Sequence, residues 1–153
     1  MMYLFLDYLE VLLVALLICI FCDVEQKNRY CLISSVISFL VMEFMQTYDL
    51  FGNEMAYAIT IINFIIVSVM KKEIKFYNFI PCIFSQWISV FTSTIVLFFF
   101  KVITNYNIEN IIKLYRIPII FLAINLFFAL IVVLNYFKSK IKNTIIEKNK
   151  YLL

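Results

Sequence analysis

Five long apolar runs, separated by short polar breaks, make up almost the whole of this chain. The runs cover about residues 3–22, 30–48, 55–70, 76–100 and 117–137. At ~1.5 Å per residue, runs of this length match the ~30 Å hydrocarbon core of a bilayer. Apolar and polar residues do not alternate with the period of two that is typical of a membrane β-barrel. The pattern therefore predicts an all-α polytopic membrane protein, a bundle of five transmembrane helices.

The composition leaves little room for another class of protein. The 153 residues are 65% hydrophobic and 15% charged, and a water-soluble domain of this kind would expose larger apolar patches than soluble monomers tolerate. Frequent Ile, Phe, Asn, Lys and Tyr are what AT-rich codons encode, which favours a bacterial source. We therefore expect a multi-pass protein of the bacterial cytoplasmic membrane, surrounded by membrane lipid.

The first run carries two acidic residues, Asp7 and Glu10, in its opening turns. Carboxylates suit the positive end of a helix dipole, and we expect these two at the membrane interface rather than in hydrocarbon. A secretory signal peptide is the alternative for this run. No Lys or Arg precedes the run and no small-residue cleavage site follows it, so a membrane span is the better prediction.

Positive charge is divided unequally between the two sides of the membrane. Ten of the 13 basic residues lie in the first break, the third break and the C-terminal segment, and the other three lie in the fourth break. The ten are Lys27, Arg29, Lys71, Lys72, Lys75, Lys138, Lys140, Lys142, Lys148 and Lys150. Lys and Arg are enriched in cytoplasmic loops, so this division predicts an outside N-terminus and a cytoplasmic C-terminus.

The same division separates two regions along the chain. Residues 1–137 form the predicted membrane domain, and residues 138–153 form a basic cytoplasmic tail. Apolar residues in the tail, such as Ile141 and Ile145, would allow it to continue the fifth helix as a short amphipathic helix that lies on or leaves the membrane surface.

The chain has no histidine, which excludes imidazole catalysis, His-ligated metal sites and a phosphoacceptor histidine within these residues. The four cysteines, Cys19, Cys22, Cys31 and Cys82, include one Cys-x-x-Cys pair. A functional dithiol is one interpretation, but these cysteines lack the neighbours of a redox or metal motif, and small apolar filler is the better one. We expect no metal, no cofactor, no catalysis and no nucleic-acid partner.

Polar residues inside the apolar runs are candidates for contacts between helices. Asn63, Ser85, Gln86 and Asn125 are interpreted as interhelical hydrogen-bonding groups. Glu43 lies near the outer end of the second run, where it would either present its charge to a ligand or reach to the membrane surface, and the sequence leaves both open. The pattern lacks the paired Gly- or Pro-broken helices and the inverted repeat of many transporters.

The fourth break, residues 101–116, is the best candidate for contact with a ligand. Ile108, Ile111, Ile112 and Tyr115 are spaced for one face of a short helix, with basic residues at its edge. A receptor would use such a surface to hold an amphipathic peptide, although an interfacial helix that only connects two spans fits these residues better when they are taken alone. The candidate ligand-binding residues at the outer side are Glu43, Asp49, Glu54, Ile108, Ile112, Lys113 and Arg116.

One stretch resembles a known family. Ile74-Lys75-Phe76-Tyr77, followed eight residues beyond Tyr77 by Ser85-Gln86, resembles the third break and fourth helix of AgrC-type peptide-pheromone receptor histidine kinases of Gram-positive bacteria. The helix order, the outside N-terminus, the short basic first break and the longer fourth break are similar over nearly the whole chain. The resemblance implies a homodimeric sensor that binds a secreted autoinducer peptide and signals to a cytoplasmic kinase.

Two functions therefore stay open at this stage. The first is a non-catalytic sensor segment of a quorum-sensing two-component system, truncated or stand-alone, with a separate kinase as partner, because the family's GHKL kinase domain and phosphoacceptor histidine lie outside these residues. The alternative is a small multi-helix membrane protein, such as a bacteriocin immunity factor or an accessory subunit, which acts by packing against a membrane partner.

Overall fold

The computed structural model describes the backbone of residues 2–48 and 53–150, and the side chains of residues 4–48 and 54–141. The described backbone is helical almost throughout and contains no β-strand, which confirms the all-α prediction. The elements are α1 (Met2–Cys22), α2 (Lys27–Thr47), α3 (Asn53–Lys71), a 3-10 turn η1 (Phe76–Asn78), α4 (Phe79–Thr104) and α5 (Ile108–Lys150).

Each α-helix in the described part of the chain is long and apolar enough to cross a membrane. The five spans are Leu4–Cys22, Lys27–Thr47, Glu54–Lys71, Phe76–Thr104 and Ile108–Ile141. The prediction of five membrane helices is confirmed, and the protein is a multi-pass membrane protein.

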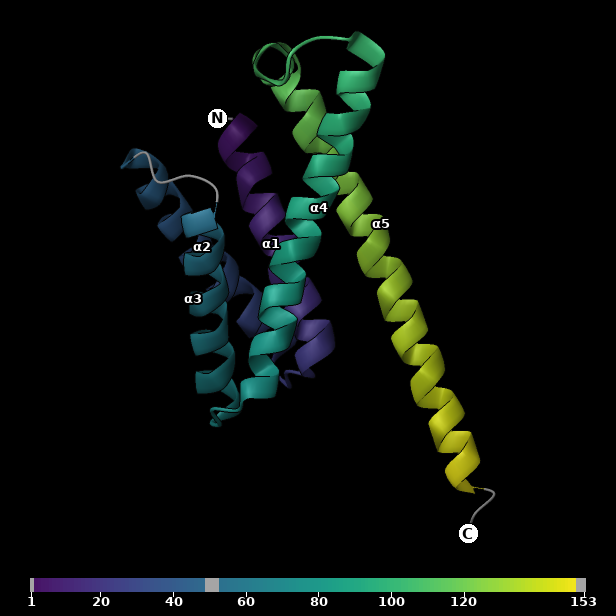
Figure 1. The fold of residues 1–153 in the computed structure, drawn as a ribbon. Helices are drawn as coiled ribbons and strands as arrows, with labels where there is room; N and C mark the ends of the chain where they lie inside the picture. Colours follow the sequence, from purple (N-terminus) through teal and green to yellow (C-terminus); the bar gives the residue numbers. More distant parts are fainter. Residues whose placement is uncertain (1, 49–52, 151–153) are drawn as a thin grey trace.

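The helices run alternately up and down (Figure 1). The start of α1, the end of α2, the start of α3 and the α4–α5 connection lie at one end of the bundle, which we call the N-terminal end. The α1–α2 and α3–α4 connections lie at the other end, together with most of the described Lys and Arg residues, and we call this the basic end. Successive helices therefore begin at opposite ends of the bundle, as expected for five helices that each cross the membrane once.

Helix α1 is the centre of the bundle. It packs against α2, α4 and α5, while α3 packs against α2 and α4. From Val11 to Cys19 every side chain of α1 is buried or partly buried, so neighbours surround these residues on all sides. A helix that is apolar all round suits this place, because it has no polar face that would need water.

The short helix predicted in the fourth break and the span predicted from residue 117 form one element, α5, which begins at Ile108. Its first turns fold back onto α4, where Ile111 is fully buried beside Val96 and the Tyr115 ring packs at a tilt against the Phe100 ring, with 5.5 Å between the ring centroids. Tyr115 has non-helical backbone angles (φ −119°, ψ 17°), so a kink separates this short helix from the span. Pro118 lies in the first turn after the kink, where its missing N–H removes no helical hydrogen bond.

The predicted basic tail begins as a helical continuation of the last span, which extends as far as Lys150. Helix α5 packs against α4 and α1, and its C-terminal part extends past the other helices at the basic end (Figure 1). The helix continues because residues 138–150 contain no Gly or Pro that would end it.

A buried polar cluster around Asn63 joins α2 to α3. Its Oδ1 accepts hydrogen bonds from Tyr30, at 3.1 Å, and from Ser34, and its Nδ2 donates to Ser38 at 3.2 Å and to the Ile59 carbonyl at 2.9 Å. The side chains of Tyr30, Ser34, Ser38 and Asn63 are all at most 1% exposed. In an apolar layer such groups have no water to bond with, so the amide fixes which face of α3 meets α2.

We expect Asn63→Leu to lower the free energy of unfolding by ~1–2 kcal/mol, because it leaves three buried hydroxyl groups without their shared partner. Asn125→Leu is the matched control, since the exposed Asn125 bonds only to the Phe121 carbonyl of its own helix. The measurement is unfolding by SDS from mild detergent, followed by circular dichroism. Equal destabilisation by the two substitutions would contradict a specific role of Asn63.

Candidate functional site

Charged side chains of three helices interact at the N-terminal end of the bundle. Asp7 of α1, which is partly buried, interacts electrostatically with Arg116 of α5 and with Glu43 of α2. The interaction with Arg116 is attractive and that with Glu43 is repulsive, so the guanidinium offsets part of the repulsion between the two carboxylates. Asp7, Glu43 and Arg116, which we call the charged cluster, thus connect helices that are far apart in the sequence.

Glu10 extends this group of charges towards α4. Ser89, which is 1% exposed, donates a hydrogen bond to Glu10 Oε1, and Glu10 also interacts electrostatically with Asp7. A carboxylate inside a membrane bundle is costly unless it is hydrogen-bonded, and Ser89 supplies a donor from the neighbouring helix.

Glu43 differs from Asp7 and Glu10 in that one of its carboxylate oxygens is buried without a hydrogen-bond donor among the described residues. Its Oε1 atom is buried and has no hydrogen-bond partner within the part of the chain that the structure describes. An unpaired buried acceptor costs ~1–3 kcal/mol, and more when it is charged. An added donor, such as an ammonium or guanidinium group of a ligand, would remove this cost.

The other predicted ligand-binding residues lie at the same end but not together. Glu54 is exposed at the start of α3, whereas Ile108, Ile112 and Lys113 are exposed at the start of α5. These two helices pack against different neighbours, α3 on α2 and α4, and α5 on α4 and α1. Asp49 lies outside the described residues. Of the predicted set, Glu43 and Arg116 each interact electrostatically with Asp7.

Three of the four predicted interhelical polar residues make no hydrogen bond to another helix within the described residues. Ser85 donates to the Pro81 carbonyl and Asn125 to the Phe121 carbonyl, both at 2.7 Å within their own helices. The buried Oε1 of Gln86 has no described hydrogen-bond partner. Only Asn63 therefore joins two helices, through the cluster described above.

Two lysines at the basic end bind the carbonyl groups that end α1. Lys71 of α3 donates to the Cys22 carbonyl at 3.0 Å, and Lys138 of α5 donates to the Ile20 carbonyl. Lys138 also forms an ion pair with Asp23 at 2.7 Å. Cations suit the negative end of a helix dipole, and here they attach α3 and α5 to the same helix end.

A small ion-pair network occupies the α3–α4 connection. Glu73 accepts from Lys75 at 2.6 Å and from the Tyr77 hydroxyl at 2.8 Å. The bond from Lys75, followed by that from Tyr77, lowers the pKa of Glu73 below its usual range, and the bond to Glu73 raises the pKa of Lys75. Both groups therefore stay charged at neutral pH, and Glu73 is occupied by cations of its own loop.

The four cysteines gather in the half of the bundle nearest the basic end, and all four are buried. Cys19 pairs with Cys31 of α2 at 3.3 Å between sulfurs, rather than with its sequence neighbour Cys22. Cys22 and Cys82 both approach the Asn78 carbonyl, at 4.0 and 3.2 Å. The Cys-x-x-Cys spacing therefore does not correspond to a pair of facing thiols.

No group of three or more His, Cys, Asp or Glu side chains among the described residues is arranged to hold a metal ion. Comparisons with known protein families, with curated proteins and with solved structures gave no match. The resemblance to peptide-pheromone receptors therefore rests on the sequence features given above.

Sequence reasoning interpreted Asp7 and Glu10 through the helix dipole and missed their contacts with α2, α4 and α5. Their spacing of three residues places both side chains on one face of α1, and this pattern indicated that the face could meet polar groups of other helices. Which helices this face would meet depends on the packing, and the sequence pattern does not contain that information.

Mild oxidation of the folded protein with copper phenanthroline should link Cys19 to Cys31, since their sulfurs are 3.3 Å apart. The bond should still form in a Cys22→Ser variant and be absent in a Cys31→Ser variant. Peptide mapping by mass spectrometry without reductant identifies the pair. A Cys19–Cys22 link in the unsubstituted protein would show that α1 and α2 meet differently.

Proposed function

We propose that this chain is a non-catalytic membrane sensor segment that binds a secreted peptide at the N-terminal end of the bundle, on the outside of a bacterial cell. The observation that carries the proposal is the charged cluster, in which Asp7 interacts with both Glu43 and Arg116. It gives a ligand one point at which to act on α1, α2 and α5 together. The absence of histidine supports a sensor without phosphotransfer chemistry of its own.

The chemistry of the cluster favours a peptide with a positive charge. Three acidic residues, Asp7, Glu10 and Glu43, lie near one basic residue, Arg116, which interacts with Asp7. The buried Oε1 atom of Glu43 has no hydrogen-bond donor among the described residues. A peptide ammonium or guanidinium would supply that donor and compete with Arg116 for the carboxylates. Exposed apolar residues at the start of α5, Ile108 and Ile112, would contact an apolar part of the same peptide.

Helix α5 supplies a route from this end to the other. Arg116 follows the kink at Tyr115, and helical backbone continues from there to Lys150. At the basic end the same helix is held by Lys138 on Asp23 and the Ile20 carbonyl. A ligand that changes the contacts of Arg116 would shift a rigid helix relative to α1, and a kinase partner or a second copy of the chain would respond to that shift at the cytoplasmic side.

A groove between α3 and α4 favours the alternative function, an accessory subunit or immunity factor that packs on a membrane partner. The groove measures about 470 Å³ and is lined by Tyr57, Ile61, Trp87 and Gln86. Gln86 Oε1 is buried there without a described partner, so a membrane helix that offers a hydrogen-bond donor would complete it.

Binding of fluorescent test peptides to membranes that contain this chain distinguishes the two functions. A cationic peptide should bind more tightly than its neutral analogue, and Asp7→Asn or Glu43→Gln should weaken binding about tenfold, since a hydrogen bond between charged groups contributes ~1.5–3 kcal/mol. Glu25→Gln, at the exposed basic end, is the control and should bind normally.

Two outcomes would contradict the sensor proposal. One is that no peptide of either charge binds. The other is that binding is indifferent to Asp7→Asn and Glu43→Gln. A membrane protein that co-purifies with the chain and is lost on Gln86→Leu, in the absence of peptide binding, would support the accessory function in its place.

The orientation has a separate test. A cysteine at Asn107, in the exposed α4–α5 connection, should react with a membrane-impermeant maleimide in intact cells, whereas one at Asn28 should react only after the cells are permeabilised. The native cysteines are buried and provide a silent background. The reverse labelling pattern would place the charged cluster on the cytoplasmic side and remove the proposed access of a secreted peptide.

A further inference from the structure

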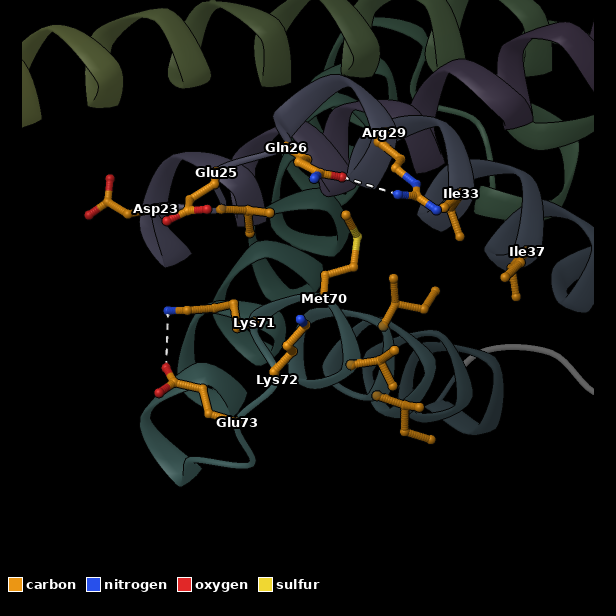
Figure 2. Close-up of a pocket in the computed structure, with 14 residues that line it drawn as sticks. Asp23, Glu25, Gln26, Arg29, Ile33, Ile37, Met70, Lys71, Lys72 and Glu73 are labelled. Carbon is orange, nitrogen blue, oxygen red and sulfur yellow. Dashed lines mark hydrogen bonds and ion pairs between the residues drawn. The ribbon is translucent and has the colours of Figure 1, made fainter.

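A groove lies at the basic end of the bundle, between α2 and α3 (Figure 2). Its volume is about 940 Å³. It is lined by charged residues near the helix ends and by isoleucine, valine and methionine deeper in the bundle. It shares no lining residue with the charged cluster, so its ligand is independent of the proposed peptide function.

Each of the two helices presents basic residues at its end and apolar residues deeper along the groove. On α2, Arg29, Ile33 and Ile37 are spaced by four residues and so lie on one face of the helix. Eight residues of helix separate Arg29 from Ile37, which is ~12 Å of depth into the membrane. The groove is therefore amphiphilic along its length, with charge at the membrane surface and hydrocarbon below it.

The wall formed by α3 repeats this arrangement. Ile65 and Val69 are one turn apart, and Lys72 follows them at the helix end. Figure 2 shows the Lys72 amine and the Arg29 guanidinium on opposite walls of the groove, with Ile33 and Ile37 continuing the wall on the α2 side. Val69 and Ile65 are 70% and 53% exposed, so the apolar part of the groove is open to lipid.

The backbone holds Lys72 firmly at this position. The Lys72 N–H bonds to the Val69 carbonyl at 3.2 Å and the Glu73 N–H to the Ser68 carbonyl at 3.1 Å, which is a Schellman motif. Lys72 occupies its left-handed position, with φ 53°, where glycine is the usual residue. A glycine would therefore fit the backbone here at least as well as the lysine.

The cations of the groove differ in how far they are already paired. The Lys71 amine is engaged by the Cys22 carbonyl, Asn78 and Glu73. The Lys72 amine, in contrast, makes no hydrogen bond or ion pair with any described residue. Arg29 gives one contact, at 3.3 Å, to the neutral Gln26, which leaves most of its five N–H donors available.

The acidic residues on the rim do not cancel these two cations. Glu73 is bound by Lys75 and Lys71, and Asp23 is bound by Lys138. In Figure 2, Asp23 and Glu25 lie towards one end of the groove, and Arg29 lies on the side where Ile33 and Ile37 line it. The charge next to the apolar walls is therefore positive.

We propose that this groove binds an anionic phospholipid, with the phosphate between Arg29 and Lys72 and an acyl chain along Ile33, Ile37, Ile65 and Val69. Basic pockets between membrane helices are suited to acidic head groups, and guanidinium binds phosphate oxygens in a planar, bidentate way. A free phosphate would use only the charged rim. The apolar walls below it require the lipid.

Native mass spectrometry of the full chain in mild detergent tests this proposal. The probes are phosphatidylglycerol and phosphatidylcholine with the same acyl chains, so that only the net charge of the head group differs. We expect phosphatidylglycerol to bind about 10- to 30-fold more tightly, since each basic contact contributes ~1 kcal/mol.

Two variants separate the groove from the general charge of the basic end. The double variant Arg29→Gln/Lys72→Gly removes the two groove cations that would bind the phosphate, and its glycine suits the left-handed backbone, so the fold should persist. It should lose the preference for phosphatidylglycerol. Lys27→Gln/Lys140→Gln removes two charges from outside the groove and should keep the preference. Circular dichroism and size-exclusion chromatography confirm that each variant is folded.

A third variant tests the apolar walls. Ile37→Trp fills the groove and leaves its charges in place, so it should weaken binding of phosphatidylglycerol, while added glycerol phosphate should not displace the bound lipid from the unsubstituted protein. Equal binding of both lipids, equal losses in the two double variants, or displacement by glycerol phosphate would overturn the proposal. Unchanged binding to Ile37→Trp would also overturn it.

Discussion

A bilayer interior offers no water to a polar group, and the arrangement of these helices follows from that constraint. A buried donor or acceptor without a partner is costly there, so hydrogen bonds between polar side chains favour particular pairings of helix faces. Asn63 gathers three hydroxyl groups of α2 on one amide, Ser89 of α4 serves the Glu10 carboxylate of α1, and lysines of α3 and α5 bind the last carbonyls of α1. The apolar side chains then fill the space between the helix faces that these few hydrogen bonds hold together.

Helix α1 is central because these contacts converge on it from several sides. At its N-terminal end, Asp7 interacts electrostatically with Arg116 of α5 and Glu10 accepts a hydrogen bond from Ser89 of α4, and its C-terminal carbonyls bind Lys71 and Lys138. The two ends of the bundle thereby differ in chemistry. One carries interacting carboxylates with an unpaired acceptor, which suits a cationic ligand, and the other carries a groove with available cations, which suits an anionic lipid. Helix α5 makes contacts at both ends and connects them.

Hydropathy and charge predicted the number of spans, their approximate limits and which connections share an end, because these depend on composition along the chain. They could not predict which helix is central. Helices α1 and α5 are the two most apolar spans, yet α1 is enclosed and α5 is peripheral, since lipid and protein neighbours accept the same apolar surface. Asn63 and Asn125 are likewise similar in sequence, but only Asn63 meets a neighbouring helix. The spacing of apolar residues in the fourth break predicted a short helix from Ile108, but it could not predict that this helix packs on α4 through Ile111.

The most direct test of the account is to measure how much of each helix lipid can reach. The unmodified protein in lipid bilayers would be photolabelled with a small apolar diazirine, and the labelled residues would be identified by mass spectrometry. The account predicts little label on α1 between Val11 and Cys19 and dense label on α5 between Phe121 and Phe137, where many side chains are exposed. Comparable labelling of the two helices would contradict a bundle built around α1.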